Sequence, residues 1–194
     1  MIKNITILMY YLLVDLLLII NTSCGSINMN NNDHQYYSNS KIISLMNNPQ
    51  SMTKFLQSLN HKLSIKKISD FTSGNQFTRI ISMDLDDTSV LIGVSTTDKN
   101  SPTFYDILSH ADTNPIGNKL FATNSKIHRN SNMQTSIIDI KSIMDSKIVQ
   151  EYLIKTLKYN NNQKIIMRQS IFENDDYEKM YLTEYVLPSI IKFL

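Results

Sequence analysis

Glycine and cysteine are scarce in this chain of 194 residues, and tryptophan is absent. The single cysteine, Cys24, excludes an internal disulfide and a metal site built from several cysteines. No GxxxxGK[ST] or GxGxxG motif occurs, and four glycines leave little material for a phosphate-binding loop. We therefore expect neither a cofactor nor a metal. The four histidines are scattered, with no two at metal-ligand spacing on one element: His34, His61, His110 and His128.

Charged residues make up only 19% of the chain, and the formal net charge is +2. Lysines and arginines are spread along the sequence without a basic block, so no nucleic-acid partner is indicated. The hydrophobic fraction of 42% is ordinary for a globular protein. A chain of this length buries a substantial core as one domain, or as one domain with an appendage.

The N-terminal segment has Lys3, a long apolar run from Ile5 to Ile20, and small polar residues around Cys24. This order is typical of a signal peptide or a lipoprotein signal. The run falls short of the roughly 20 residues that span a bilayer, and Asp15 inside it costs about 2.5–3.5 kcal/mol near the membrane centre. A lipoprotein signal also requires an apolar residue where Asn21 stands. Two interpretations stay open: a signal or anchor, and an apolar helix that packs on the domain or lies at a membrane surface.

Residues 26–40 are polar and predict a linker, so we expect an appendage over 1–40 and a folded domain over 41–194. Strand and helix patterns do not alternate as in βαβ units. The expected fold class is therefore α+β, an antiparallel β-sheet with helices packed on one side. We expect helices over 41–48, 51–63 (with Ser51 as its N-cap), 103–111 and 135–158, and a turn over 114–121. We expect strands in a hairpin over 77–97, whose two adjacent aspartates suit its turn, and at 163–173 and 178–188.

Two of the expected strands carry a charged residue in an apolar row. Because side chains alternate between the faces of a strand, Glu184 and Arg79 each share a face with apolar neighbours. A lone buried charge is unfavourable, so it is normally paired or exposed. Periodicity alone favours a structural Arg–Glu pair or a less buried face; the alternative is a pocket in which Arg79 clamps a carboxylate and Glu184 faces a hydroxyl or a proton. The apolar neighbours are Phe77, Ile81, Met83, Met180, Leu182 and Val186.

Four blocks of the sequence carry a resemblance to an enzyme family. They are SMTKFLQSL (51–59), TRIISMDLDDTSVLIGVSTT (78–97), TNPIGNKLF (113–121) and YLTEYVLP (181–188). In the same order, they are similar to the flap segment, the arginine-bearing hairpin, the Pro-[Leu/Ile]-Gly turn and the C-terminal strand of chorismate pyruvate-lyase. This family converts chorismate to 4-hydroxybenzoate and pyruvate. One block alone would be weak evidence, but four in order make a fairly specific match.

The resemblance implies an antiparallel sheet with helical flaps that bury the ligand, and a carbon–oxygen lyase that supplies 4-hydroxybenzoate for ubiquinone biosynthesis. It implies that Arg79 and Glu184 are catalytic, with Arg79 on the ring carboxylate and Glu184 at the hydroxyl or ether-oxygen end of the ligand. Met52 and Ile116 would close over the ligand, partly through backbone contacts. Arg168 would be a second contact to an anion.

The chemistry needs no metal or cofactor, because loss of the side chain makes the ring aromatic, which is a large driving force. The protein has to hold the substrate in a reactive conformation and transfer one proton. Apolar neighbours should raise the pKa of Glu184 by desolvation, whereas a nearby Arg79 would oppose the shift. The sequence departs from the family pattern at Arg168-Gln169-Ser170, where a second arginine is usual, and residues 136–162 resemble an insertion.

Because chorismate is made in the cytosol, we expect a cytoplasmic monomer whose partner is chorismate, with residues 5–20 either as a surface anchor that contacts the membrane or as a packed helix. Two alternatives from other classes stay open. One is a non-catalytic protein that binds a small aromatic acid, as in effector domains of transcription regulators. The other is an exported lipoprotein, which the N-terminal segment alone favours.

Overall fold

The computed structural model describes residues 40–47, 51–122, 125–130, 133–143 and 146–194. The chain divides into one unit over Met1–Gln35 and a second over Tyr36–Leu194, and all described residues belong to the second. The interpretations of Cys24 and of the run over 5–20 thus lie outside the described residues. Among the described helices, none has the length and apolar character needed to cross a membrane.

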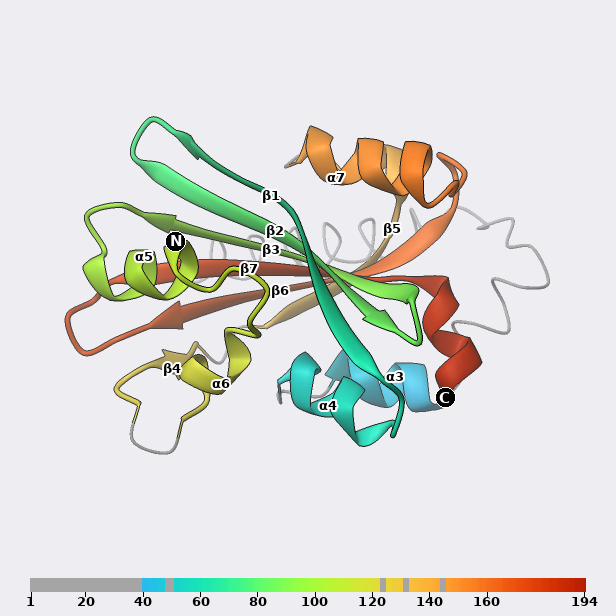
Figure 1. Cartoon of the computed structure of the whole chain (residues 1–194), viewed down its shortest axis with the longest axis horizontal. Coiled ribbons are helices and arrows are strands. Elements are labelled where there is room, and N and C mark those ends of the chain that lie inside the picture. Colours follow the sequence, from blue (N-terminus) through green and yellow to red (C-terminus); the bar gives the residue numbers. More distant parts are fainter. Residues whose placement is uncertain (1–39, 48–50, 123–124, 131–132, 144–145) are drawn as a thin grey trace, which may run out of the picture. The chain divides into compact units, whose positions relative to one another are not determined.

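A seven-stranded antiparallel sheet forms the centre of the second unit, in the order β1-β2-β3-β7-β6-β4, with β5 also paired to β6 (Figure 1). The expected α+β class with an antiparallel sheet is confirmed. The strands are β1 (Leu63–Ser73), β2 (Gln76–Leu85), β3 (Thr88–Asp98), β4 (His128–Arg129), β5 (Gln134–Asp139), β6 (Lys164–Glu173) and β7 (Lys179–Val186).

The helices are short and lie at both ends of the chain's second unit and between its strands. They are α3 (Ser40–Asn47), α4 (Met52–Ser58), α5 (Pro102–Ser109), α6 (Gly117–Leu120) and α7 (Lys147–Glu151). A π-helical turn over Tyr152–Thr156 continues α7, and 3-10 turns occupy Ile140–Ser142 and Pro188–Phe193.

The β2–β3 hairpin turns at two aspartates, as its sequence predicts. Asp86 and Asp87 have φ angles of 44° and 64°, the left-handed pair that a two-residue hairpin turn requires. Asp86 also holds the start of β1, because its carboxylate accepts from the Lys62 backbone N–H at 3.0 Å and lies 2.7 Å from His61 Nδ1. The second expected hairpin, β6–β7, is also present, with Glu173 paired to Lys179 at its turn.

Three expectations about local structure were wrong. Residues 135–158 are not one helix, because β5 takes the first part and pairs with β6, while helix begins only at Lys147. Strand pairing here overrides a helical spacing of apolar residues. β1 was not expected, since as an edge strand it is largely half-buried or exposed and shows weak alternation. The stretch expected as a turn over 114–121 ends in helix α6.

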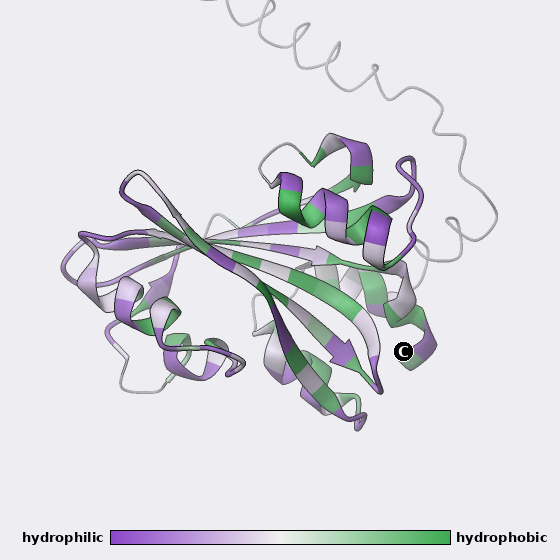
Figure 2. Ribbon diagram, turned by 45° about the horizontal axis from the view of Figure 1, so that its top comes forward, coloured by the Kyte–Doolittle hydropathy of each residue, from purple (hydrophilic) through white to green (hydrophobic). Residues whose placement is uncertain are grey.

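The two faces of the sheet bury different apolar clusters, so helices lie on both faces and not on one. One face carries two clusters, the first covered by α3, α4 and the C-terminal 3-10 turn, the second by α5 and α6. The opposite face carries a third cluster with α7 and the π-helical turn. Figure 2 shows hydrophobic and hydrophilic residues interspersed along the strands. Where both faces are covered, strands carry consecutive buried residues, as β2 and β3 do. Fully buried members of the three clusters include Leu56, Leu91 and Val186; Phe104, Phe172 and Met180; and Ile92, Leu153 and Val149.

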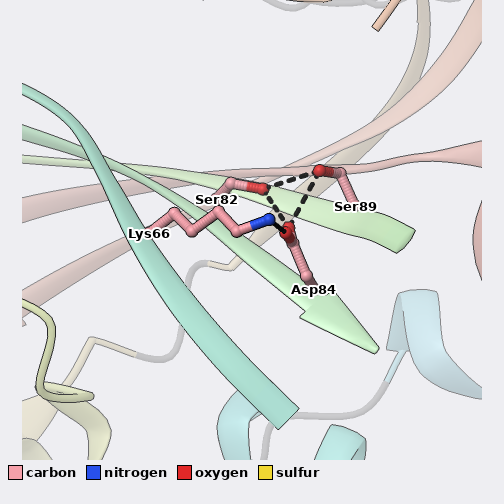
Figure 3. A network of polar contacts seen from close by, with 4 residues as sticks. All are labelled: Lys66, Ser82, Asp84 and Ser89. Atoms are coloured by element: carbon pink, nitrogen blue, oxygen red, sulfur yellow. Dashed lines mark hydrogen bonds and ion pairs between the residues drawn. The ribbon is translucent and has the colours of Figure 1, made fainter. Parts of the chain in front are cut away.

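A buried polar network links β1, β2 and β3 (Figure 3). Asp84 Oδ1 accepts from Ser82 Oγ at 2.5 Å and from Ser89 Oγ at 2.8 Å, and Lys66 Nζ lies 2.7 Å from Asp84 Oδ2. Burial by itself raises the pKa of Asp84, but the hydrogen bonds from Lys66, Ser82 and Ser89 outweigh it and hold the pKa below its ordinary value. The carboxylate is therefore charged inside the fold, with Oδ1 hydrogen-bonded to the two serines and Oδ2 ion-paired with Lys66.

Candidate functional site

An enclosed pocket lies between the two apolar clusters that share one face of the sheet. Strands β2, β3 and β7 form its floor, and the start of α4, helix α6 and the short strand β4 form its cover (Figure 1). The floor residues are Ile81, Met83, Leu91, Gly93, Ser95, Leu182 and Glu184, and the covering residues are Ser51, Met52, Thr53, Ile116, Gly117, Leu120, Phe121 and Arg129.

The pocket is narrow in this conformation. It leaves about 30 Å³ for the centres of water-sized molecules, within about 410 Å³ of space between atoms that includes solvent at its mouth. A single buried water needs about 10–15 Å³ by the first measure. The pocket as it stands therefore has no more room than a few water molecules need, and a ring-shaped ligand requires its cover to move outward.

The cover is held by a close contact between α4 and α6. Ser51 caps α4, because its Oγ accepts from the Lys54 backbone N–H at 3.5 Å. A Cβ atom on Gly117, at the start of α6, would lie only 2.8 Å from that same Oγ. Glycine is thus the residue that lets the two helices approach, and the approach places Met52 and Ile116 over the floor.

Glu184 supplies the acidic group in the pocket lining. It is 5% exposed, and its Oε2 lies 3.6 Å from Nη1 of Arg168, its direct neighbour on β6. Burial raises the pKa of Glu184, and the charges of Arg168 and then Arg129 oppose the shift without cancelling it. The ion pair that the sequence left open is therefore made by Arg168, and the carboxyl of Glu184 keeps its proton more readily than an exposed glutamate.

Arg79 is 1% exposed on β2 but is not among the residues that line the pocket. Its Nη2 donates to the backbone oxygens of Asp112 at 2.6 Å and Asn114 at 3.1 Å, in the loop that leads to Ile116. Its Nε and Nη1 have no hydrogen-bond partner within the described part of the chain. Burial lowers the pKa of Arg79, with Asp112 and Asp70 opposing. Arg79 thus positions the cover and keeps two donors for a further acceptor.

Arg129, on β4, is the charged residue of the pocket lining that the sequence did not indicate. Its guanidinium carbon lies 5.0 Å from the ring centroid of Phe121 and 4.9 Å from that of Phe172. These are cation–π distances. A two-residue strand has no periodicity from which a buried face can be deduced, so only the pairing of Arg129 with Phe172 on β6 reveals its position.

The described residues contain no cluster of three or more histidine, cysteine, aspartate or glutamate side chains that would hold a metal ion. The fold and the site together define an antiparallel α+β protein with an enclosed, helix-covered pocket that carries one carboxyl and one guanidinium group on otherwise neutral walls.

No known protein family and no curated protein matches the sequence. Several solved structures have a similar backbone at low identity. The effector domain of PhnF from Mycobacterium smegmatis is 8% identical, with 71% of this chain and 88% of that chain covered and a TM-score of 0.49. The possible transcriptional regulator YydK from Bacillus subtilis is 10% identical, with 72% and 64% covered and a TM-score of 0.47. A GntR-family transcriptional regulator from Enterococcus faecalis is 12% identical, with 66% and 91% covered and a TM-score of 0.43.

Proposed function

We propose that the protein is a chorismate pyruvate-lyase, which eliminates pyruvate from chorismate and yields 4-hydroxybenzoate for ubiquinone biosynthesis. The observation that supports this most is the position of Glu184, buried in an apolar pocket with its pKa raised. A carboxyl group whose pKa is raised by burial holds its proton more readily than an exposed one and is suited to act as a general acid. The pocket also brings together Met52, Ile116 and Glu184, three of the four binding residues that the resemblance implied.

The proposed reaction balances without a co-reactant. Chorismate carries two carboxylates and an enolpyruvyl ether on a cyclohexadiene ring. Glu184 gives its proton to the ether oxygen as the bond from that oxygen to the ring breaks, and the side chain leaves as enolpyruvate. The ring then loses the hydrogen on its hydroxyl-bearing carbon as a proton, which restores the carboxyl of Glu184 and makes the ring aromatic. Enolpyruvate tautomerises to pyruvate.

Arg79 anchors the ring carboxylate in this proposal. The guanidinium is rigid and buried, its Nη2 is held by the Asp112 and Asn114 carbonyls, and its Nε and Nη1 lack partners within the described residues. A carboxylate oxygen that accepts from Nε or from Nη1 would gain a charge-assisted hydrogen bond; the two donors point to different sides of the guanidinium, so one carboxylate does not span both. Because the same guanidinium fastens the loop before Ile116, anchoring of the ligand and closure of the cover would be coupled.

Binding of a small aromatic acid without turnover is the second candidate function. It is favoured by the place of Arg79, which serves a loop and lies outside the pocket lining in this conformation. In that case the closed cover would be the output of ligand binding, and Glu184 would serve as a hydrogen-bond partner for a ligand hydroxyl.

The test incubates the purified full-length chain with chorismate, without added metal, and measures 4-hydroxybenzoate and pyruvate over time. We expect equal amounts of both products. Arg79→Ala should abolish turnover, and Glu184→Gln should lower kcat by about 10²–10⁴-fold, the range for loss of a general acid. Full turnover by Glu184→Gln would remove the acid role.

Two other outcomes decide between the candidates. A folded chain that binds 4-hydroxybenzoate and forms no product would establish the binding protein and overturn the lyase. A folded chain that neither binds nor reacts would overturn both. Intact-mass measurement of the cellular protein tests the lipoprotein alternative, because processing would remove the residues before Cys24.

A further inference from the structure

The pocket is surrounded by more positive than negative charge. Arg79 and Arg168 are fully buried, Arg129 is half-buried in the pocket lining, and Glu184, which pairs with Arg168, is the carboxyl of that lining. The carboxylates that act on Arg79, Asp70 and Asp112, are largely exposed to solvent and so are screened. Such an excess of buried guanidinium groups suits a ligand that carries more than one negative charge.

The guanidinium of Arg129 is held in a fixed orientation. Phe121 and Phe172 stand edge to face, with ring centroids 5.5 Å apart and planes at 87°, and Arg129 lies over both rings. Its Nη1 contacts Met133 Sδ at 3.9 Å, and Nη2 of Arg168 contacts the same sulfur at 3.3 Å. Arg129 and Arg168 therefore approach the same end of the pocket, where Glu184 also lies.

Only one of these two arginines lines the pocket. Arg129 lines the pocket together with Glu184, whereas Arg168 stands behind Glu184 as its ion-pair partner and is not part of the lining. The charge of Glu184 acts on Arg129, since it raises a pKa that burial otherwise lowers. The acid and a preoriented cation thus share one end of the pocket, and Arg79 is fastened to the loop before Ile116.

We propose that Arg129 binds the enolpyruvyl carboxylate of the substrate and thereby distinguishes the dianionic substrate from the monoanionic product. The identity of the substrate rests on the proposed lyase function. In chorismate, the ether oxygen and the second carboxylate are attached to the same carbon. A group that binds this carboxylate must therefore stand beside the acid that protonates the ether, and Arg129 occupies that place. The product 4-hydroxybenzoate lacks this carboxylate and makes no contact of this kind.

The test compares the full-length wild type with Arg129→Met, which keeps an unbranched apolar stem between the two rings, and Arg129→Lys, which keeps the charge without the two-point fork. Calorimetric titration measures the affinities for 4-hydroxybenzoate and for 3-[(1-carboxyvinyl)oxy]benzoate, an unreactive aromatic dicarboxylate with the same side chain as chorismate. Lys126→Met, an exposed cation three residues away, is the matched control.

We expect Arg129→Met to weaken binding of the dicarboxylate by about ten- to a hundredfold, the usual effect of losing a charge-assisted hydrogen bond. Binding of 4-hydroxybenzoate should change by less than about twofold, within the scatter of additive surface changes, and the KM for chorismate should rise as the dicarboxylate affinity falls. The affinity of Arg129→Lys for the dicarboxylate should lie between those of the wild type and Arg129→Met. Lys126→Met should leave the affinities for both ligands unchanged.

The outcomes separate this inference from the proposed function. If the wild type does not prefer the dicarboxylate, or if Arg129→Met weakens both ligands equally, the role of Arg129 is wrong, whether or not chorismate reacts. If the selective loss occurs and chorismate is not turned over, the lyase is wrong and the site takes a dicarboxylate. Retained binding of 4-hydroxybenzoate shows that a variant is folded, and Arg129→Lys carries the test if Arg129→Met does not fold.

Discussion

Single charged residues in apolar strands were the most informative feature of the sequence. Glu184 and Arg79 are both buried on the same face of the sheet, in the rows that strand alternation assigned to them. The partners of these two residues could not be predicted from the sequence. Arg168 contacts Glu184 because of the register of β6 on β7. Arg79 contacts the backbone of Asp112 and Asn114 because a loop folds back over β2. Register depends on every pair in a ladder and is therefore a property of the folded sheet.

The raised pKa of Glu184 predicts a pH-dependent stability difference. A carboxyl whose pKa is raised in the folded state contributes stability that is present below its pKa in the unfolded chain and is lost as pH rises through the folded-state value. Glu184→Gln cannot ionise, so its melting temperature relative to the wild type should increase from about pH 4, the ordinary carboxyl pKa, towards alkaline pH. Thermal melts by circular dichroism measure this, and a difference that stays constant with pH would contradict it.

The pKa of Asp84 is shifted in the opposite direction, and its effect on stability depends on pH in the opposite way. Its pKa is lowered, because hydrogen bonds from Lys66, Ser82 and Ser89 outweigh the effect of burial, so its stabilising contribution is present at neutral pH and is lost as pH falls through its folded-state pKa. Asp84→Asn should lower the free energy of unfolding at pH 7 by about 1–3 kcal/mol. The gap to the wild type should close in acid.

Urea titrations at neutral and acidic pH measure this gap. Asp175→Asn, at an exposed position in the β6–β7 turn, is the control and should be neutral. An Asp84→Asn variant as stable as the wild type at pH 7 would show that the network is dispensable.

At the scale of elements, local chemistry was sufficient wherever a cap or a turn marks a boundary. Ser51 begins α4 and the two aspartates turn the β2–β3 hairpin, as predicted. The prediction failed over 135–158, where a helical spacing of apolar residues is overridden by pairing of β5 with β6, and at β1, whose edge position removes the alternation.

The contact of α4 with α6 gives a prediction for Gly117→Ala. The added Cβ would stand 2.8 Å from Ser51 Oγ, so the hydroxyl must rotate away and give up the Lys54 N–H that it caps. We expect a loss of about 1 kcal/mol in the free energy of unfolding, the usual effect of losing an N-cap. Ser51→Gly removes the obstructing hydroxyl and itself costs only a few tenths of a kcal/mol.

A double-mutant cycle by urea unfolding measures the coupling. The double variant should be more stable than the sum of the two single changes allows, because the nearest obstacle to the new Cβ is then gone and the next atom, Thr53 Oγ1, lies 3.3 Å away. Strict additivity would mean that the two helices do not touch through these residues in solution.

At the scale of the whole molecule, the two faces of the sheet have different roles. One face holds two apolar clusters with the pocket between them, and the opposite face holds a third cluster under α7. The pocket lies where residues of the two clusters meet over Glu184 and Gly93 of the floor.

All described members of the three clusters belong to the unit Tyr36–Leu194, and this predicts that the unit folds by itself. A chain that starts at Tyr36 should show the same far-ultraviolet circular dichroism per folded residue and a cooperative melt within a few degrees of the full-length protein. It should also bind 4-hydroxybenzoate with the same affinity. An aggregated or non-cooperative product would show that the fold depends on residues before Tyr36.

The sequence by itself determined the α+β class, the two long hairpins, the cap of α4 and the two charged residues in apolar rows. These follow from interactions between residues close in the chain, such as a capping hydroxyl or the alternation of a strand. Only the tertiary structure decided that Arg168 pairs with Glu184, that Arg79 holds a loop and that Arg129 enters the pocket. The physical reason is that those contacts join distant residues through strand register and helix packing, and no local pattern encodes either.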